Sequence, residues 1–174
     1  TLLKNKGLLE MAKLLLKKQT EILVANERDL QMAKEKGISQ AMLDRLTLNA
    51  ERLQDMAEGL RQVAGLPDPI GEVLSMWKTE NELQIGQKRV PLGVIGMIYE
   101  ARPNVTCDAA GLCLKTGNAV ILRGGSEAIH SNMAIVAILR EALKNVGLPV
   151  DSVQMIENTS RELALEMMRC NTYI

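Results

Sequence analysis

The chain has 174 residues, 21 Lys and Arg against 21 Asp and Glu, 47% apolar residues and only 2% aromatic residues, with no Phe. A neutral chain with so few aromatic rings lacks the cationic surface and the stacking platforms that nucleic-acid-binding proteins use. The longest uncharged stretch, residues 128–139, is too short to span a bilayer. We therefore expect neither a nucleic acid nor a membrane as a partner.

The cysteine and histidine content points to a reduced, cytoplasmic protein. Cys107, Cys113 and Cys170 form no C-x-x-C pair, and an odd number of cysteines cannot all pair within the chain. The single histidine, His130, excludes a zinc site built on several histidines within this chain. We expect His130 to be structural or exposed to solvent, and we expect no metal.

Residues 1–66 are predicted to form an N-terminal helical segment of about four helices. Apolar residues recur there at i, i+3, i+4 and i+7, as in Leu8, Met11, Ala12 and Leu15. Thr20, Ser39 and Asn49 are candidate N-caps. Residues 67–90 follow as a linker and an exposed β-hairpin, because two prolines interrupt the helical pattern and alternation resumes at 79–90, with a turn expected at Gly86.

Residues 91–174 alternate between apolar runs of strand length and helical patterns, which predicts part of a nucleotide-binding α/β domain. Strands are expected at 94–99, 119–122 and 153–156. Helices are expected at 105–115, at 127–145 and after Thr159, which has capping-box spacing to Glu162. The fold class is therefore α/β with a Rossmann-like parallel sheet. Residues 171–174 resemble the start of a fourth strand, so we expect the sheet to be incomplete and the chain to be the N-terminal portion of a longer enzyme.

The first strand is followed by a polar turn that contains Glu100, Arg102 and Asn104, with Pro103 at the start of the next helix. Ligands gather at the carboxyl ends of strands in open parallel sheets. An Asn amide held rigidly there can donate to a developing oxyanion. The alternative is that Asn104 is only an N-cap and that Glu100 and Arg102 pair with each other.

The second strand ends in Arg123, Gly124, Gly125 and Ser126. Paired glycines, a hydroxyl and a cation at such a turn suit a phosphate or a ribose. The turn matches neither G-x-G-x-x-G nor the P-loop pattern, so an ordinary strand-to-helix turn with a solvated Arg is an equal alternative. If both turns bind ligands, we expect them to converge on one pocket.

At these turns the sequence resembles the gamma-glutamyl phosphate reductases of bacterial proline biosynthesis, also called glutamate-5-semialdehyde dehydrogenases, within the aldehyde dehydrogenase superfamily. The main block is VPLGVIGMIYEARPNVTCDAAGLCLKTGNAVILRGGSEAIHSN at residues 90–132. Further matching segments lie at residues 21–30, 43–48, 60–73 and 147–158. The resemblance covers essentially the whole chain and implies an aldehyde dehydrogenase-like fold.

The resemblance implies NADPH-dependent reduction of L-glutamate 5-phosphate to L-glutamate 5-semialdehyde and phosphate. By position, Asn104 matches the oxyanion asparagine. Arg123, with Gly124, Gly125 and Ser126 beside it, matches the cofactor-binding turn. Glu100 and Arg102 are candidates for orienting the substrate.

The nucleophilic cysteine of the family lies downstream of Ile174, and none of the three cysteines matches it. The catalytic-cysteine domain is therefore expected to be absent from this chain, which alone should be inactive. The resemblance also implies a homo-oligomer for the full-length protein, and glutamate 5-kinase is a candidate partner.

Two other readings stay open at this stage. The chain could be a standalone nucleotide-binding or interaction module, which the intact mass of the native protein would reveal. Alternatively, the parent protein could be a general aldehyde dehydrogenase that oxidises free aldehydes without needing phosphate.

Overall fold

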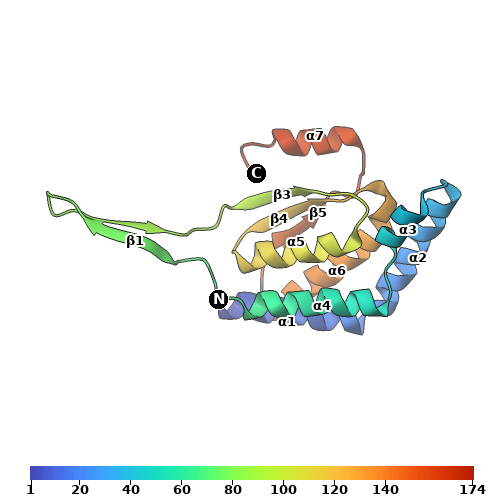
Figure 1. Cartoon of the computed structure of the whole chain (residues 1–174), viewed down its shortest axis with the longest axis horizontal. Coiled ribbons are helices and arrows are strands. Elements are labelled where there is room, and N and C mark those ends of the chain that lie inside the picture. Colours follow the sequence, from blue (N-terminus) through green and yellow to red (C-terminus); the bar gives the residue numbers. More distant parts are fainter.

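A three-stranded parallel sheet lies at the centre of the chain, in a computed structural model that describes residues 1–174 (Figure 1). Its strands are β3 (Val94–Ile98), β4 (Ala119–Arg123) and β5 (Val153–Met155), in the order β3-β4-β5. The pairing of β3 with β4 runs from Val94 opposite Ala119 to Ile98 opposite Arg123. The three predicted strands and the parallel sheet are therefore confirmed.

One face of this sheet is covered by two layers of helices. The first layer is α5 (Pro103–Lys115) and α6 (Ile129–Val146), and α1 (Leu2–Lys17) and α4 (Ala50–Gly65) lie beyond it (Figure 1). Val120 and Leu122 point from β4 into this core and are almost fully buried. One continuous apolar core includes side chains of the N-terminal helices as well as of the sheet.

The opposite face of the sheet carries α7 (Arg161–Arg169), which is reached through the short helix η2 (Val150–Ser152) and β5. The side chain of Met167 packs close over Gly96 of β3. The cap of α7 is Ser160, whose Oγ accepts from the backbone N–H of Leu163 at 3.3 Å, so the expected cap at Thr159 is displaced by one residue. Residues 171–174 form a turn that closes on the carbonyl of Cys170, and the expected fourth strand is not formed there.

The four predicted N-terminal helices are confirmed, with α2 (Gln19–Glu35) and α3 (Gln40–Leu46) between α1 and α4. Asn49 caps α4, because its side chain accepts from the backbone N–H of Arg52 at 2.7 Å. Ser39 occupies the N-cap position of α3. The prediction for Thr20 is wrong, because only Lys18 separates α1 from α2 and Thr20 already lies inside the second helix.

A buried carboxylate joins α2 to the start of α6. Asp29 is 2% exposed and accepts from the backbone N–H of Ser131 at 2.8 Å and from its hydroxyl at 2.6 Å. The imidazole Nδ1 of His130 lies 2.7 Å from the same carboxylate. Asp29 thus caps α6 from another helix, and His130 has a structural partner that the sequence did not reveal.

The expected hairpin is present and projects away from the body of the protein (Figure 1). It consists of β1 (Val73–Lys78) and β2 (Gln84–Lys88), and its turn lies at residues 79–83 rather than at Gly86. The backbone N–H of Thr79 donates to the carbonyl of Leu83 at 2.9 Å, and Glu82 takes the left-handed conformation that closes the turn. Gly86 instead pairs with Met76 inside the ladder.

None of the helices combines the length with the apolar character that crossing a membrane requires. The short helix η1 (Ser126–Ala128) completes the elements, between β4 and α6. Helix η1 begins at Ser126, the last residue of the second polar turn.

Candidate functional site

The two polar turns lie side by side because their strands are neighbours. Ile98, the last residue of β3, pairs with Arg123, the last residue of β4. The backbone N–H of Tyr99 also donates to the carbonyl of Arg123 at 3.1 Å. Both turns therefore leave the sheet at its carboxyl edge, where ligands bind in open α/β sheets.

In the polar turn after β3, Asn104 lies one residue inside helix α5 and not at its N-cap. The helix begins at Pro103 and Arg102 is the N-cap residue. Asn104 is exposed, and its Nδ2 donates to Oδ2 of Asp108 at 3.3 Å. Glu100 and Arg102 are joined only by a backbone hydrogen bond of 2.8 Å, and their side chains form no ion pair.

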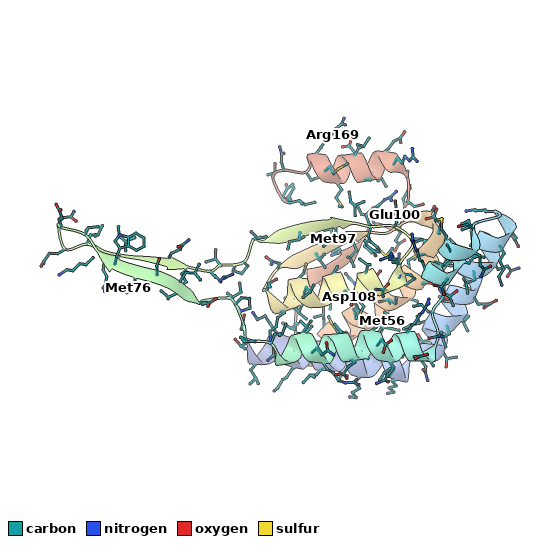
Figure 2. All side chains as sticks on the ribbon, viewed as in Figure 1. Met56, Met76, Met97, Glu100, Asp108 and Arg169 are labelled. Atoms are coloured by element: carbon teal, nitrogen blue, oxygen red, sulfur yellow. The ribbon has the colours of Figure 1, made fainter.

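Asn104 lines a hollow of about 450 Å³ between the start of α5 and helices α3 and α4, here called the α4–α5 hollow. Its floor includes Met56, which Figure 2 labels on α4 beside Asp108 on α5. Most of its lining is charged, from Asp44, Arg45, Arg52, Asp55, Arg102 and Asp108. Burial raises the pKa of Asp108 above the ordinary value for an aspartate, and the hydrogen bond from Asn104 opposes that shift.

Arg123 opens into a second hollow of about 570 Å³ at the ends of β3 and β4, here called the β3–β4 hollow. The structure brings Glu100, Gly125 and Ser126 to the same hollow. Figure 2 labels Glu100 at the sheet edge where this hollow lies.

A third hollow of about 120 Å³ lies between the other two and shares Arg102 with the α4–α5 hollow and Glu100 with the β3–β4 hollow. Asn104 and Arg123 therefore line neighbouring hollows. The third hollow joins the two, and the convergence of both turns on one cofactor pocket stays a prediction.

The guanidinium of Arg123 is partly committed within the protein. Its Nη2 donates to the carbonyl of Thr159, and to that of Ser160 at 3.3 Å, just before α7. Its Nε is buried and has no hydrogen-bond partner. Arg123 thus ties β4 to the start of α7, and neither of these hydrogen bonds uses its Nη1.

A hydrogen-bonded chain supports both turns from beneath. The hydroxyl of Tyr99 lies 2.6 Å from Oγ1 of Thr106, which donates to Oδ1 of Asn132 at 2.8 Å. Burial raises the pKa of Tyr99, which keeps its hydroxyl protonated. Gly124 lies against this chain, because a Cβ there would come within 2.3 Å of Nδ2 of Asn132. Packing therefore requires glycine at residue 124, independently of any ligand.

The cysteines do not supply a nucleophile to these hollows. Cys107 and Cys113 are buried in the core, where desolvation raises the pKa of both thiols. Cys170 is exposed at the far end of α7. No three His, Cys, Asp or Glu side chains cluster closely enough to hold a metal ion.

Several lining residues were missed from the sequence. Arg161 and Thr159 reach the β3–β4 hollow from the start of α7. Asp55 and Arg45 reach the α4–α5 hollow from α4 and α3, for which the apolar period predicted helices but no site residues. The only signal was the matching segment at 43–48, which contains Arg45 but does not indicate that it faces a hollow.

A parallel sheet flanked by helices, with polar hollows at the carboxyl ends of its strands, is typical of α/β proteins that bind ligands at that edge. The chain belongs to the aldehyde dehydrogenase family, whose family model matches residues 5–173. The family resemblance seen in the sequence and the predicted α/β fold class are confirmed.

Individual relatives agree with this placement. The chain is 65% identical to a gamma-glutamyl phosphate reductase of Clostridium botulinum over 98% of its length. It is 48% identical, with a TM-score of 0.96 over 98% of its length, to the solved structure of gamma-glutamyl phosphate reductase from Thermotoga maritima. For the Saccharomyces cerevisiae enzyme of the same name, the identity is 32% and the TM-score 0.85 over 92% of the chain. The chain spans 41%, 41% and 42% of these three proteins, respectively.

Proposed function

We propose that the whole protein reduces L-glutamate 5-phosphate to L-glutamate 5-semialdehyde and phosphate with NADPH, and that this chain contributes the oxyanion and cofactor-binding residues. The observation that carries the proposal is the 65% identity over 98% of the chain to a protein named gamma-glutamyl phosphate reductase. The two hollows at the sheet edge give that similarity a chemical basis.

Asn104 is proposed as an oxyanion donor. Its amide nitrogen carries two hydrogens, and one of them is directed to Asp108, which restrains the side chain. The other hydrogen is available to an oxygen that gains negative charge in the transition state. The free N–H groups in the first turn of α5 favour the same negative charge.

The β3–β4 hollow is proposed to hold the adenosine ribose of NADPH, and its lining suits that group. The cationic guanidinium of Arg123, whose Nη1 takes no part in the hydrogen bonds to Thr159 and Ser160, suits a 2'-phosphate, with Arg161 as a second cation. Glu100 and Glu127 offer acceptors for ribose hydroxyls, and Ser126 adds a hydroxyl of its own. When bound, NADPH would supply the hydride.

The nucleophile is proposed to be a cysteine in the part of the protein outside this chain, since none of the chain's own cysteines lines either hollow. Its thiolate would attack the acyl carbon, and the bond from that carbon to the phosphate oxygen would break. Hydride addition to the thioester and cleavage of the carbon–sulfur bond would then release the aldehyde and restore the thiolate. Asn104 would stabilise the oxyanion in both steps.

Three further features complete the proposal. We propose that the full-length protein is a homo-oligomer and acts in the cytoplasm. Glutamate 5-kinase is the proposed supplier of the labile acyl phosphate. The exposed apolar side chains of the hairpin, Met76 and Trp77, are consistent with an assembled protein.

The proposal is tested by the reverse reaction of the full-length protein. L-Glutamate 5-semialdehyde and NADP⁺ should yield NADPH only when phosphate or arsenate is present, because one of these anions must accept the acyl group of the thioester. Oxidation at the same rate without either anion would instead identify a general aldehyde dehydrogenase. Absence of turnover with both anions present would reject the reductase assignment.

A further inference from the structure

The α4–α5 hollow is lined by charges of both signs. Arg45, Arg52 and Arg102 contribute the cations, and Asp44, Asp55 and Asp108 contribute the anions. Such a balanced lining differs from that of an anion site, in which cations and N–H groups dominate. The arrangement of these six side chains decides which of them a ligand could use.

One cation and one anion of this set are already engaged with each other. Nη2 of Arg52 lies 3.0 Å from Oδ1 of Asp44, and Nη1 donates to the backbone carbonyls of Asp44 and of Thr47, the latter at 2.6 Å. These bonds fix the loop between α3 and α4. Arg52 and Asp44 therefore build the wall of the hollow.

The other four charges form no ion pair within the chain. Arg45, Arg102, Asp55 and Asp108 are absent from its salt bridges, although all four line the same hollow. Asp108 accepts one hydrogen bond, from Asn104. The hollow thus presents two cations and two anions to whatever enters it.

From this lining we infer that the α4–α5 hollow binds the α-ammonium and α-carboxylate groups of an amino-acid substrate. Asp55 and Asp108 would accept from the ammonium, and Arg45 and Arg102 would donate to the carboxylate. Both groups of an amino acid are charged at neutral pH. A guanidinium matches a carboxylate through paired N–H groups, and an ammonium has three donors for carboxylate oxygens.

The hollow suits the amino-acid end of the substrate better than its phosphate end. A phosphate in it would leave the carboxylates of Asp55 and Asp108 without a cationic partner, whereas the α-ammonium supplies one. The inference rests on the proposed function, and it assigns the amino-acid end of that substrate to named residues. Asn104 borders the same hollow, and only two methylene groups separate the α-carbon of a glutamyl substrate from its reacting carbonyl. One bound molecule can therefore reach both the charges and the oxyanion donor.

The test compares two aldehydes in the full-length protein, with phosphate and NADP⁺ present. L-Glutamate 5-semialdehyde carries the α-amino group, and 5-oxopentanoate is the same chain without it. The ratio of kcat/KM for the amino acid to kcat/KM for 5-oxopentanoate is measured in the wild type and in each variant. Asp55→Asn should lower the ratio of the two kcat/KM values by about tenfold, mainly through KM for the amino acid. Each substrate is compared with itself across variants, so spontaneous cyclisation of the semialdehyde cancels.

Glu58→Gln is the matched control, because it removes the same charge from the same helix. Glu58 pairs only with Arg61, at 3.2 Å. This control should keep the wild-type ratio. Asp108→Asn provides a second variant should Asp55→Asn fold poorly, and it too should lower the ratio. An unchanged ratio in both Asp variants would overturn the inference.

The carboxylate half of the inference has its own comparison. 4-Aminobutanal keeps the amine and the aldehyde but lacks the α-carboxylate. Arg45→Gln combined with Arg102→Gln should reduce the preference for the full substrate over 4-aminobutanal by about tenfold or more. An unchanged preference would remove the two arginines from the assignment.

Failure of this inference can be separated from failure of the proposed function. Phosphate-dependent turnover in which neither Asp55→Asn nor Asp108→Asn changes the kcat/KM ratio would contradict the amino-acid subsite and leave the reductase standing. Absence of phosphate-dependent turnover would reject the reductase. Calorimetric binding of L-glutamate itself, present in wild type and weakened in Asp55→Asn, would then still support the subsite, and its absence from wild type would overturn it.

Discussion

Asn104 donates from Nδ2 to Oδ2 of Asp108 at 3.3 Å, one turn further along α5. The contact joins the proposed oxyanion donor to a carboxylate of the proposed amino-acid subsite. It also fixes the direction of the amide in a side chain that is otherwise exposed. Binding of the substrate's charged end and alignment of its carbonyl would therefore depend on the same turn of helix.

Replacing Asn104 tests the oxyanion role. Asn104→Ala in the full-length protein should lower kcat by about a hundredfold or more, the usual cost of removing one oxyanion donor. Steady-state kinetics would measure the effect. Asn145→Ala, on the exposed side of α6, is a control that should retain wild-type kcat. An unchanged kcat in Asn104→Ala would remove that residue from the chemistry.

Arg123 should discriminate between the two nicotinamide cofactors. Arg123→Ala should weaken binding of NADPH more than that of NADH, because only NADPH carries the 2'-phosphate. The two dissociation constants can be measured by fluorescence titration. Loss of the contacts to Thr159 and Ser160 should weaken both cofactors to a similar extent, so the ratio is the informative quantity.

Arg169→Ala removes a cation from the exposed end of α7, which Figure 2 labels, and should leave the cofactor ratio unchanged. Equal weakening of NADPH and NADH by Arg123→Ala would exclude the 2'-phosphate contact. Arg123 would then serve only to tie β4 to α7.

Gly124 should tolerate no side chain. Gly124→Ala places a Cβ within 2.3 Å of Nδ2 of Asn132, so the unfolding free energy should fall by about 1–3 kcal/mol. Gly59→Ala is the matched control, since nothing lies within 4 Å of a Cβ at that position of α4. The control should raise stability by about 0.5–1 kcal/mol. Equal changes in both variants, measured by urea unfolding, would contradict the close packing beneath the second turn.

Asp68 should make stability sensitive to acid. Lys4 donates to its carboxylate at 2.9 Å, and this hydrogen bond, with others, holds the pKa of Asp68 far below its ordinary value. Because the folded pKa lies below the unfolded one, the contribution is complete above about pH 5 and is lost as pH falls. Asp68→Asn should flatten this acid-side loss, and Lys4→Met should do the same. Urea titrations at several pH values would measure the unfolding free energy. If both variants lost stability with falling pH as steeply as the wild type, the pair would have no such role.

Burial should make Cys107 unreactive. Desolvation raises the pKa of its thiol, so almost no thiolate exists at neutral pH. A maleimide should label Cys107 only after denaturation, whereas a thiol activated for catalysis would react in the native protein. Mass spectrometry of labelled peptides would locate the adduct, and native labelling of Cys107 would contradict the assignment of this residue to the core.

Much of the α/β portion could be predicted because local pattern and tertiary role agree there. The runs at residues 94–99 and 119–122 are apolar on both faces, as buried parallel strands require, and both became strands of the sheet. The four N-terminal helices likewise followed from their apolar period. Periodicity does not locate turns as well, so the hairpin turn was placed at Gly86 although Thr79 and Glu82 close it.

The site was only partly accessible from sequence for a topological reason. Asn104 and Arg123 could be recognised because each lies at or just beyond the carboxyl end of an apolar strand, and adjacent strands bring their turns together. Asp55 and Asp108 are helical residues whose hollow exists only once α4 packs against α5. Nothing in the spacing of Asp29 and His130, which lie 101 residues apart in the chain, indicates their contact.

Reduction of an acyl phosphate at this edge of the sheet should couple phosphate release to NADPH consumption. The most direct measurement follows NADPH consumption and phosphate release together, with full-length protein and L-glutamate 5-phosphate formed in situ by glutamate 5-kinase. One phosphate should be released for each NADPH consumed, and both rates should fall together in Asn104→Ala. Phosphate released faster than by spontaneous hydrolysis, without NADPH consumption, would contradict the coupled reduction. NADPH consumption at the wild-type rate in Asn104→Ala would contradict the role of Asn104.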